Sequence, residues 1–184
     1  MAPENSSQRG ASIVNPKFAI DWPVSYLMIN NASRILVSIL NFVSPIYGRR
    51  RIENLETGDI FQLVTRDARS ILLLDVRSDC ETVVSMIPGA MTRRNFECRC
   101  RELQKNLVVA YCTVGGRSLL YAQQLAAKGF DVRNYGGSIL AWCEDGNPLV
   151  KPDGSTTNQL HTHNRFIKAP SGYERVWKAL PDDR

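Results

Sequence analysis

The chain has no uninterrupted apolar run long enough to cross a bilayer. A spanning helix needs about 20 consecutive, mostly apolar residues. The most apolar stretch, residues 23–43, is broken by Asn30, Asn31, Ser33 and Arg34. With 43% hydrophobic and 22% charged residues, the composition is typical of a globular protein. These features argue against a multi-span membrane protein and against a disordered chain.

Cysteine is sparse and irregularly placed. The five cysteines are an odd number without regular spacing: Cys80, Cys98, Cys100, Cys112 and Cys143. The first residues do not resemble a secretory signal, so a disulfide framework is not expected. We therefore expect a reducing intracellular compartment, the cytoplasm first and the mitochondrion as the alternative. In such a compartment a thiol stays available as a nucleophile.

Metal-binding and nucleic-acid-binding signatures are also lacking. Cys98 and Cys100 could in principle form a zinc site with His161 and His163, but about sixty residues separate the two pairs and no loop signature flanks them. We expect no metal and no cofactor. The net charge of +5 fits anionic substrates or a membrane surface, and without a nucleic-acid motif it does not indicate nucleic-acid binding.

The sequence divides into four parts. Residues 1–22 are polar and aperiodic, which predicts a flexible arm or a targeting peptide. Residues 23–51 predict an amphipathic helix and a basic linker, residues 52–150 a folded domain, and residues 151–184 a tail that packs on this domain. One domain with extensions suits a chain of 184 residues.

The predicted N-terminal helix carries apolar residues at helical spacing. They are Met28, Ala32, Ile35, Leu36, Ile39, Leu40 and Val43. One interpretation packs this face on the core of the domain. The other uses the helix, together with Arg49, Arg50 and Arg51, to bind a protein partner or a membrane surface.

Strands and helices alternate along the predicted domain. We expect strands over residues 71–77, 107–111 and 131–135, and helices over residues 80–85, 95–105 and 119–128. Continuous apolar strands are usually buried on both faces, which indicates a parallel sheet in an α/β domain. Ligands of such domains bind beyond the carboxyl ends of the strands. In the tail, Gly172–Trp177 predict a short helix that docks an aromatic side chain on the domain or lines the substrate pocket.

Cys112 lies between a predicted strand and a predicted helix. It follows the strand over residues 107–111 directly and stands just before a helix N-terminus. There the unpaired N–H groups and the helix dipole favour the anionic thiolate. Gly115 and Gly116 let the loop curl, so that its N–H groups converge on one point. The pattern predicts an anion-binding nucleophile.

Three blocks of the sequence, between Ile52 and Val150, resemble the rhodanese-like (sulfurtransferase) family. The blocks are Leu74-Asp75-Val76-Arg77 with Glu81 and Ile87-Pro88-Gly89-Ala90, the loop from Cys112 to Ser118, and Asn134-Tyr135-Gly136-Gly137 with Trp142, Gly146 and Pro148. The resemblance implies a doubly wound α/β fold, with about five parallel strands and helices on both faces of the sheet. The chain departs from the family pattern at Ser85-Met86, in place of Gly-His, and at Ser138, in place of an aromatic residue. Because both lie outside the loop, we expect them to affect surface and partner details more than the chemistry.

The resemblance also implies a thiosulfate sulfurtransferase-like enzyme. Cys112 would take a sulfane sulfur from a small anionic donor such as thiosulfate, and pass it as a persulfide to cyanide or a thiol. Arg117 would clamp the anion, and Ser118 would also cap the helix. The substrate-binding residues would be Thr113, Val114, Gly115, Gly116, Arg117 and Ser118. Asp75 and Arg77 would give structural support through ion pairs.

Other interpretations stay open. Cys112 could be an inert buried cysteine, or one whose oxidised form another cysteine resolves. Arg117 could pair with a carboxylate such as Asp75 or Glu81. Related cysteine phosphatases use Cys-x5-Arg, whereas four residues separate Cys112 from Arg117, so phosphatase or arsenate-reductase chemistry is the lesser alternative. A non-catalytic partner-binding or redox-sensing module is the third class.

Overall fold

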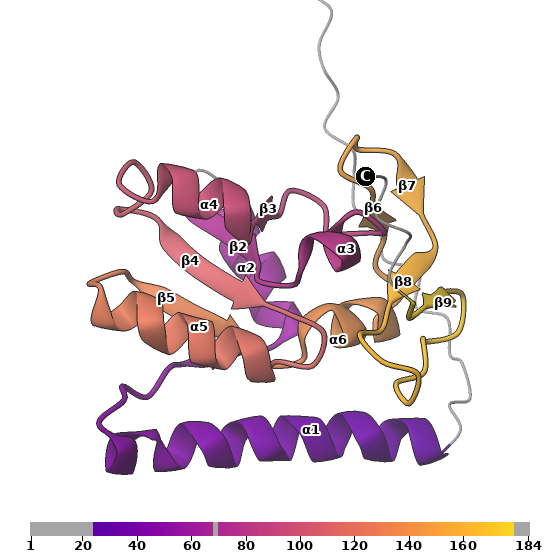
Figure 1. Cartoon of the computed structure of the whole chain (residues 1–184), viewed down its shortest axis with the longest axis horizontal. Coiled ribbons are helices and arrows are strands. Elements are labelled where there is room, and N and C mark those ends of the chain that lie inside the picture. The colour runs from indigo at the N-terminus through magenta and orange to yellow at the C-terminus, as the bar shows by residue number, and fades with distance from the viewer. Residues whose placement is uncertain (1–23, 68–69, 179–184) are drawn as a thin grey trace, which may run out of the picture.

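A single parallel sheet forms the centre of the molecule. The computed structural model describes residues 24–67 and 70–178 of the chain, so the arm predicted for residues 1–22 lies outside the described residues. The sheet has five strands in the order β1-β5-β4-β2-β3 (Figure 1). They are β1 (Asn54–Leu55), β2 (Ile71–Asp75), β3 (Met91–Thr92), β4 (Leu107–Tyr111) and β5 (Val132–Tyr135). The predicted five-stranded parallel sheet is confirmed.

Helices cover both faces of the sheet. One face carries α4 (Arg93–Arg99) and α5 (Gly116–Ala127), and the other carries α2 (Thr57–Asp67) and α6 (Ser138–Glu144). Side chains of β4 alternate between these two cores, Val108 and Ala110 toward α5, Val109 and Tyr111 toward α6. As a central strand buried on both sides, β4 places the residue that follows it, Cys112, at the carboxyl edge of the sheet.

Two of the predicted helices are shorter than expected. Beyond β2, α3 (Asp79–Thr82) forms a single turn. Helix α4 ends at Arg99, and the residues after it turn back toward β4. After this turn, Leu103 packs against the core on the α5 side of the sheet.

The tail after residue 150, together with β6 just before it, builds two small sheets beside the carboxyl edge. Strands β6 (Leu149–Val150) and β7 (Thr156–Thr157) pair antiparallel, while β8 (Gln159–His161) and β9 (Glu174–Val176) pair in parallel. The short helix predicted for Gly172–Trp177 is therefore wrong, because this segment pairs its backbone with β8 instead. Tyr173, just before β9, packs against the core on the α6 side, and its hydroxyl donates to the Asn147 carbonyl oxygen (2.6 Å).

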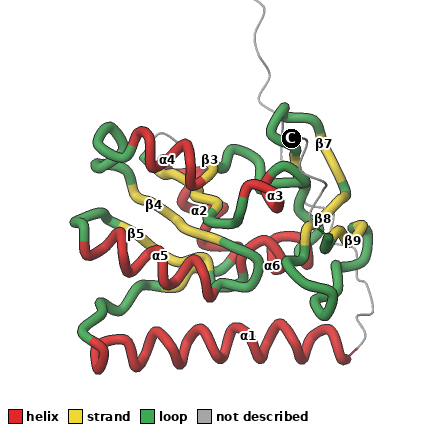
Figure 2. The backbone as a smooth tube through the Cα atoms, viewed as in Figure 1, coloured by secondary structure: helices red, strands yellow, loops and turns green. Residues whose placement is uncertain are grey.

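Helix α1 (Val24–Val43) lies outside this layered domain, next to α5 (Figure 2). A 3-10 turn, η1 (Ser44–Tyr47), follows it. The apolar pattern points away from the domain, since Ile35, Leu36 and Ile39 are exposed. The helix does pack on the core of the domain, through Val37, which is 3% exposed and lies in the core on the α5 side of the sheet, while the exposed residues of the apolar pattern stay outside this contact. Among the described residues, no helix is long and apolar enough to span a membrane.

Candidate active site at the carboxyl edge of the sheet

The candidate site lies where β4 ends and α5 begins. Cys112 follows β4, and Gly115 is the N-cap of the 12-residue helix α5. Gly115 has a φ of 88°, and a Cβ atom there would collide with the carbonyl oxygen of Gly136. Only glycine fits this position. Gly116 has open space around its Cβ position and no positive φ, so the curl of the loop depends on one glycine rather than on both.

The sulfur of Cys112 is buried and meets donors from the start of α5. The residue is 1% exposed. The Gly115 N–H donates to Sγ (3.2 Å), and the Ser118 hydroxyl oxygen lies 3.6 Å from Sγ. The same hydroxyl donates to the Gly115 carbonyl (3.0 Å), and its one proton cannot serve both acceptors. When the sulfur is anionic, the hydroxyl can rotate toward it, which stabilises the charge together with the helix N-terminus.

Ser118 does not cap the helix, contrary to the prediction. Helix α5 begins at Gly116 rather than at residue 119, so Ser118 falls inside its first turn and is fully buried. The shift has a physical cause, since Gly115 adopts the left-handed conformation that lets the backbone enter the helix earlier. Ser118 thereby faces the sulfur instead of the end of the helix.

Ser138 takes part in the site, although its place in the sequence suggested a surface detail. Its hydroxyl accepts from the backbone N–H of Cys112 (3.1 Å) and donates to the carbonyl oxygen of Tyr135 (2.8 Å). Ser138 is fully buried and has a φ of 55°, a conformation uncommon for residues other than glycine. The expectation for this departure from the family pattern is therefore wrong, because Ser138 is buried and fixes the backbone of Cys112.

The other departure, Ser85-Met86, is also interior. Both residues are buried, and the Met86 N–H donates to the carbonyl oxygen of Val150 (2.7 Å). The Ser85 carbonyl accepts from Arg77 (2.5 Å). This pair therefore links the loop after α3 to the start of the tail, and the expectation of a surface role is wrong here as well.

Replacing Ser138 with alanine is expected to lower the free energy of unfolding by about 1–3 kcal/mol, because it leaves the buried Cys112 N–H without its acceptor. Ser85→Ala is the matched control. Ser85 is equally buried, and its hydroxyl has no hydrogen-bond partner within the described part of the chain, so a change within about 0.5 kcal/mol is expected. Urea unfolding of both variants measures the difference. Equal losses would contradict the role given to Ser138.

Glu81 and Thr113 hold Arg117. The two terminal nitrogens of Arg117 donate to the two carboxylate oxygens of Glu81 (2.7 and 2.8 Å), and Nη2 also donates to the Thr113 hydroxyl (2.9 Å). The side chains of Glu81 and Arg117 are 2% and 36% exposed. Arg117 therefore forms the ion pair with Glu81 that the sequence left open as an alternative to substrate binding. Because the Arg117 side chain stays partly exposed, it can meet a ligand without leaving the pair.

The pKa of Glu81 is strongly lowered. Burial alone would raise it, but hydrogen bonds from Arg117 and Ser78 outweigh burial and lower the pKa to about 2. The N–H and hydroxyl of Ser78 donate to the same carboxylate oxygen (3.0 and 2.7 Å) at the start of α3. Glu81 is therefore a fixed anion that joins α3 to the loop after Cys112.

The stability contributed by Glu81 is expected to fall at acid pH. Its pKa is about 2 in the folded chain against an ordinary value of 4.5, so the unfolded chain takes up this proton first as the pH falls. The contribution is complete above pH 4.5 and is lost toward pH 2, with a total of about 3 kcal/mol. Urea unfolding measures the free energy of unfolding of wild type and of Glu81→Gln between pH 7 and pH 3. The difference between the two free energies should become smaller as the pH falls. A difference independent of pH would contradict this pKa.

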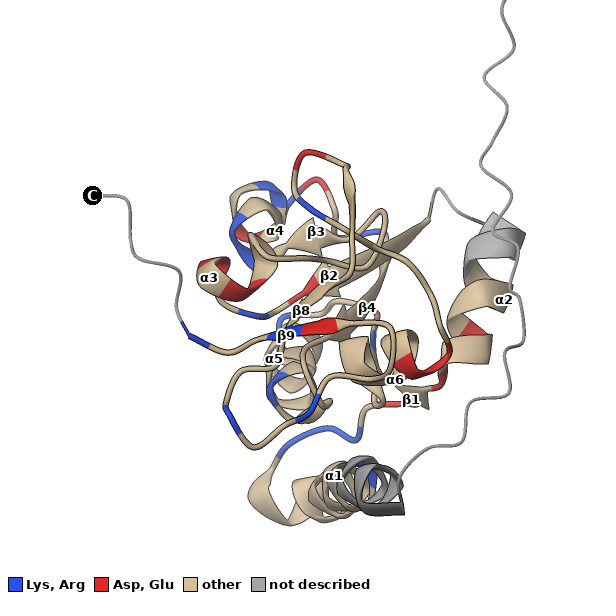
Figure 3. Ribbon diagram, turned by 90° about the vertical axis from the view of Figure 1, so that its right-hand side faces the viewer, with Lys and Arg blue, Asp and Glu red and all other residues tan. Residues whose placement is uncertain are grey.

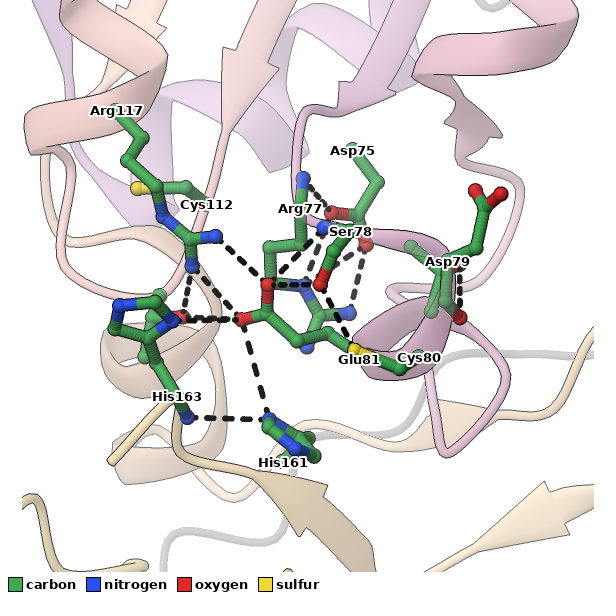
Figure 4. Close-up of polar contacts among 12 residues, drawn as sticks. Asp75, Arg77, Ser78, Asp79, Cys80, Glu81, Cys112, Arg117, His161 and His163 are labelled. Atoms are coloured by element: carbon green, nitrogen blue, oxygen red, sulfur yellow. Dashed lines mark hydrogen bonds and ion pairs between the residues drawn. The ribbon is translucent and has the colours of Figure 1, made fainter. Parts of the chain in front are cut away.

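Two histidines of the tail reach the same carboxylate (Figure 4). Nδ1 of His161, at the end of β8, lies 4.0 Å from Oε1 of Glu81, and Nδ1 of His163 lies 3.8 Å from it. Burial lowers the pKa of His161, although the Glu81 carboxylate raises it, so the neutral imidazole is favoured. From the sequence both histidines were considered only as zinc ligands, and their contact with Glu81 was not predicted, because they are far from Glu81 in the chain and no local spacing indicates it.

Asp75 and Arg77 form a second ion pair, which is completely buried. The Arg77 Nη2 donates to Asp75 Oδ2 (2.7 Å), and Nε donates to Oδ1 (3.0 Å). Burial alone would lower the pKa of Arg77, but the Asp75 carboxylate raises it. The expected ion pair is present, and it fixes the chain between β2 and α3.

The remaining predicted site residues have different surroundings. Val114 packs against the core on the α6 side, while Gly116 is the first residue of α5. All five cysteines are free thiols. No group of three or more metal-binding side chains occurs among the residues that the structure describes. His161 and His163 therefore belong to the surroundings of Glu81, and the substrate-binding roles of the loop residues stay predictions.

Comparison with known proteins places this site in a family. Residues 62–145 match the rhodanese-like domain family. A sulfurtransferase of Allochromatium vinosum is 36% identical over 92 residues, which cover 48% of this chain and 86% of that protein.

Two solved structures are similar to the chain. A thiosulfate sulfurtransferase of Pseudomonas aeruginosa has a TM-score of 0.50 and 21% identity, over 69% of this chain and 24% of that one. A Bacillus halodurans protein has a TM-score of 0.48 and 19% identity, over 67% of this chain and 86% of that one. The first of these shows the fold, and the identity to the Allochromatium protein over most of its length shows the relationship. The chain belongs to the rhodanese-like domain family of sulfurtransferases.

Proposed function

We propose that the chain moves a sulfane sulfur from a small anionic donor such as thiosulfate to a thiophilic acceptor, through a persulfide on Cys112. The observation that carries the proposal is the position of the Cys112 sulfur. It accepts the N–H of Gly115 at the N-terminus of α5, with the Ser118 hydroxyl within reach. These groups stabilise an anionic sulfur without a neighbouring base.

In the first step, the Cys112 thiolate attacks the outer sulfur of thiosulfate. A bond forms between the two sulfur atoms, and the bond between the outer sulfur and the sulfonate group breaks. Sulfite leaves with the electron pair of that bond, and Cys112 becomes a persulfide anion. The new terminal sulfur carries the charge, so the donors at the start of α5 must stabilise an atom beyond Sγ as well as Sγ itself.

In the second step, the acceptor attacks the terminal sulfur. Cyanide forms a carbon–sulfur bond and leaves as thiocyanate, while the sulfur–sulfur bond breaks and its electron pair returns to Cys112. The thiolate is restored and no net oxidation of the protein occurs. A thiol acceptor takes the sulfur in the same way, as a small persulfide.

Arg117 supplies the positive charge for the anionic donor in this proposal. Its guanidinium is oriented by Glu81 and Thr113, and a planar guanidinium suits the oxygens of a sulfonate or sulfite group. Glu81 neutralises part of this charge, which favours release of the sulfite product. The pair therefore supports weak and reversible binding of a small anion rather than tight binding.

The length of the loop supports sulfur over phosphate. Thr113, Val114, Gly115 and Gly116 are the four residues between Cys112 and Arg117, and a phosphatase cradle of this kind needs five. The Gly115 N–H is directed at the sulfur itself, whereas binding of a tetrahedral phosphate requires N–H groups directed at oxygens farther out.

The assay that tests the proposal compares two reactions of the wild-type chain. Thiocyanate formation from thiosulfate and cyanide should exceed the background rate and saturate with thiosulfate. Hydrolysis of an aryl phosphate by the same preparation should stay at the rate of the buffer. Phosphate hydrolysis without thiocyanate formation would favour the phosphatase alternative, and absence of both reactions would favour a partner-binding or redox-sensing module.

A further inference from the structure

Large apolar side chains at helical spacing are exposed along α1. These side chains are 43–80% exposed, and they come from α1 and the turn that follows it: Ile35, Leu36, Ile39, Leu40, Phe42 and Ile46. Apart from Phe42 and Ile46, these are residues of the apolar pattern in the sequence. Scattered exposed apolar residues are normal, but a contiguous apolar helix face indicates an interaction site. We refer to these six residues as the outer face of α1.

Polar contacts and the buried side chain of Val37 hold α1 in this orientation. On its inner side, Arg34 pairs with Glu56, and the Asn41 side chain accepts from the backbone N–H of Ile52 (2.9 Å). One turn later, the Ser44 hydroxyl accepts from Gln123 of α5 (2.6 Å). Rotating the helix to bury the outer face would break all of these contacts. The apolar surface is therefore a fixed feature of the fold.

The segment that carries the outer face is positively charged. Residues 24–51 contain Arg34, Arg49, Arg50 and Arg51 and no acidic residue. The last three arginines are exposed and begin one residue after η1, in the blue linker above α1 in Figure 3. The Arg51 guanidinium lies over the Phe42 ring, 4.6 Å from its centroid. Basic and apolar side chains thus meet at the C-terminal end of α1.

We propose that the outer face of α1 lies in the interfacial layer of an anionic membrane, parallel to its plane. The apolar side chains would enter the region between headgroups and acyl chains, while the arginines of the linker would contact anionic headgroups. A second copy of the chain fits less well, because its residues 24–51 would offer no carboxylate to these arginines. An anionic lipid surface complements both the apolar area and the charge.

Cosedimentation of the full chain with vesicles tests the proposal. Vesicles of phosphatidylcholine with phosphatidylserine should bind the chain, and vesicles of phosphatidylcholine alone should bind it more weakly. The double variant Leu36→Gln/Ile39→Gln should lower the partition coefficient by more than about tenfold, because two apolar side chains are lost from the interface. Glutamine keeps a high helix propensity, so α1 should remain folded.

Phe166→Gln is the matched control. Phe166 is 73% exposed and lies in the tail, outside α1, so its replacement removes exposed apolar area without touching the outer face. Binding of Phe166→Gln should equal that of the wild type. The proposal is overturned if the chain does not bind anionic vesicles, if both replacements weaken binding equally, or if the outer face instead mediates a dimer that Leu36→Gln/Ile39→Gln dissociates. Because this test uses no enzymatic readout, it succeeds or fails independently of sulfur transfer.

Discussion

Replacing Cys112 with serine is expected to lower the rate of thiocyanate formation by at least about a thousandfold. A serine hydroxyl at this position stays protonated at neutral pH and cannot carry a sulfane sulfur, so neither half of the reaction proceeds. The substitution changes one atom. The Gly115 N–H and the Ser118 hydroxyl can still meet an oxygen at this position, so we expect the variant to fold and to lose only turnover.

Cys143→Ala is the matched control for this variant. Cys143 is also 1% exposed, but it belongs to the apolar core on the α6 side. Burial raises the pKa of its thiol, which keeps it neutral and unreactive. We expect Cys143→Ala to retain turnover within about a factor of three while losing some stability. A rate in Cys112→Ser that equals the wild-type rate would remove Cys112 from the mechanism.

Replacing Glu81 with glutamine is expected to cost about 3 kcal/mol of unfolding free energy. The change leaves Arg117 partly buried without its counter-charge, and breaking a buried pair by removing one partner is strongly destabilising. It also gives Arg117 its full positive charge, so the KM for thiosulfate should fall severalfold while product release slows. Urea unfolding and a thiosulfate titration measure the two effects separately.

Glu97→Gln provides the control for the Glu81 variant. Glu97 pairs with Arg93 at the same N–O distance of 2.7 Å, but both side chains are 50% exposed. An exposed pair of this kind contributes about 0.3–0.5 kcal/mol. We therefore expect a small loss of stability and no change in KM. Equal losses of unfolding free energy in both variants would show that burial does not determine how much the pair between Glu81 and Arg117 stabilises the fold.

The arrangement around Cys112 was largely predictable because it depends on local signals. An apolar strand, a glycine with positive φ and an amphipathic helix follow one another within the span from residue 107 to residue 127. Each signal reports the conformation of its own residues, so the strand–loop–helix order could be inferred from sequence. The parallel sheet followed from the continuous apolar character of β2 and β4.

The environment of the site was not predictable to the same extent. Ser138 lies 26 positions from Cys112 in the sequence, and its role depends on how closely α6 approaches the loop. His163 reaches Glu81 only because β8 and β9 pair beside α3 (Figure 4). Contacts of this kind are set by the packing of distant elements, which residue spacing does not encode.

Helix α1 shows a different limit of sequence interpretation. Its periodicity correctly indicated one apolar face, but periodicity does not say whether that face points inward or outward. The direction depends on the neighbouring surface of α5, where Gln123 offers a hydrogen bond to Ser44 rather than an apolar contact. Val37 and the polar side chains of Arg34 and Asn41 therefore face the domain, while Ile39 is exposed.

The most direct test of sulfur transfer is an intact-mass measurement of the chain after exposure to thiosulfate, followed by peptide mapping. We expect a gain of one sulfur atom, located on the peptide that contains Cys112, absent in Cys112→Ser and removed by cyanide with formation of thiocyanate. An adduct on another cysteine that cyanide also removes, or turnover without any adduct on Cys112, would contradict the proposed mechanism.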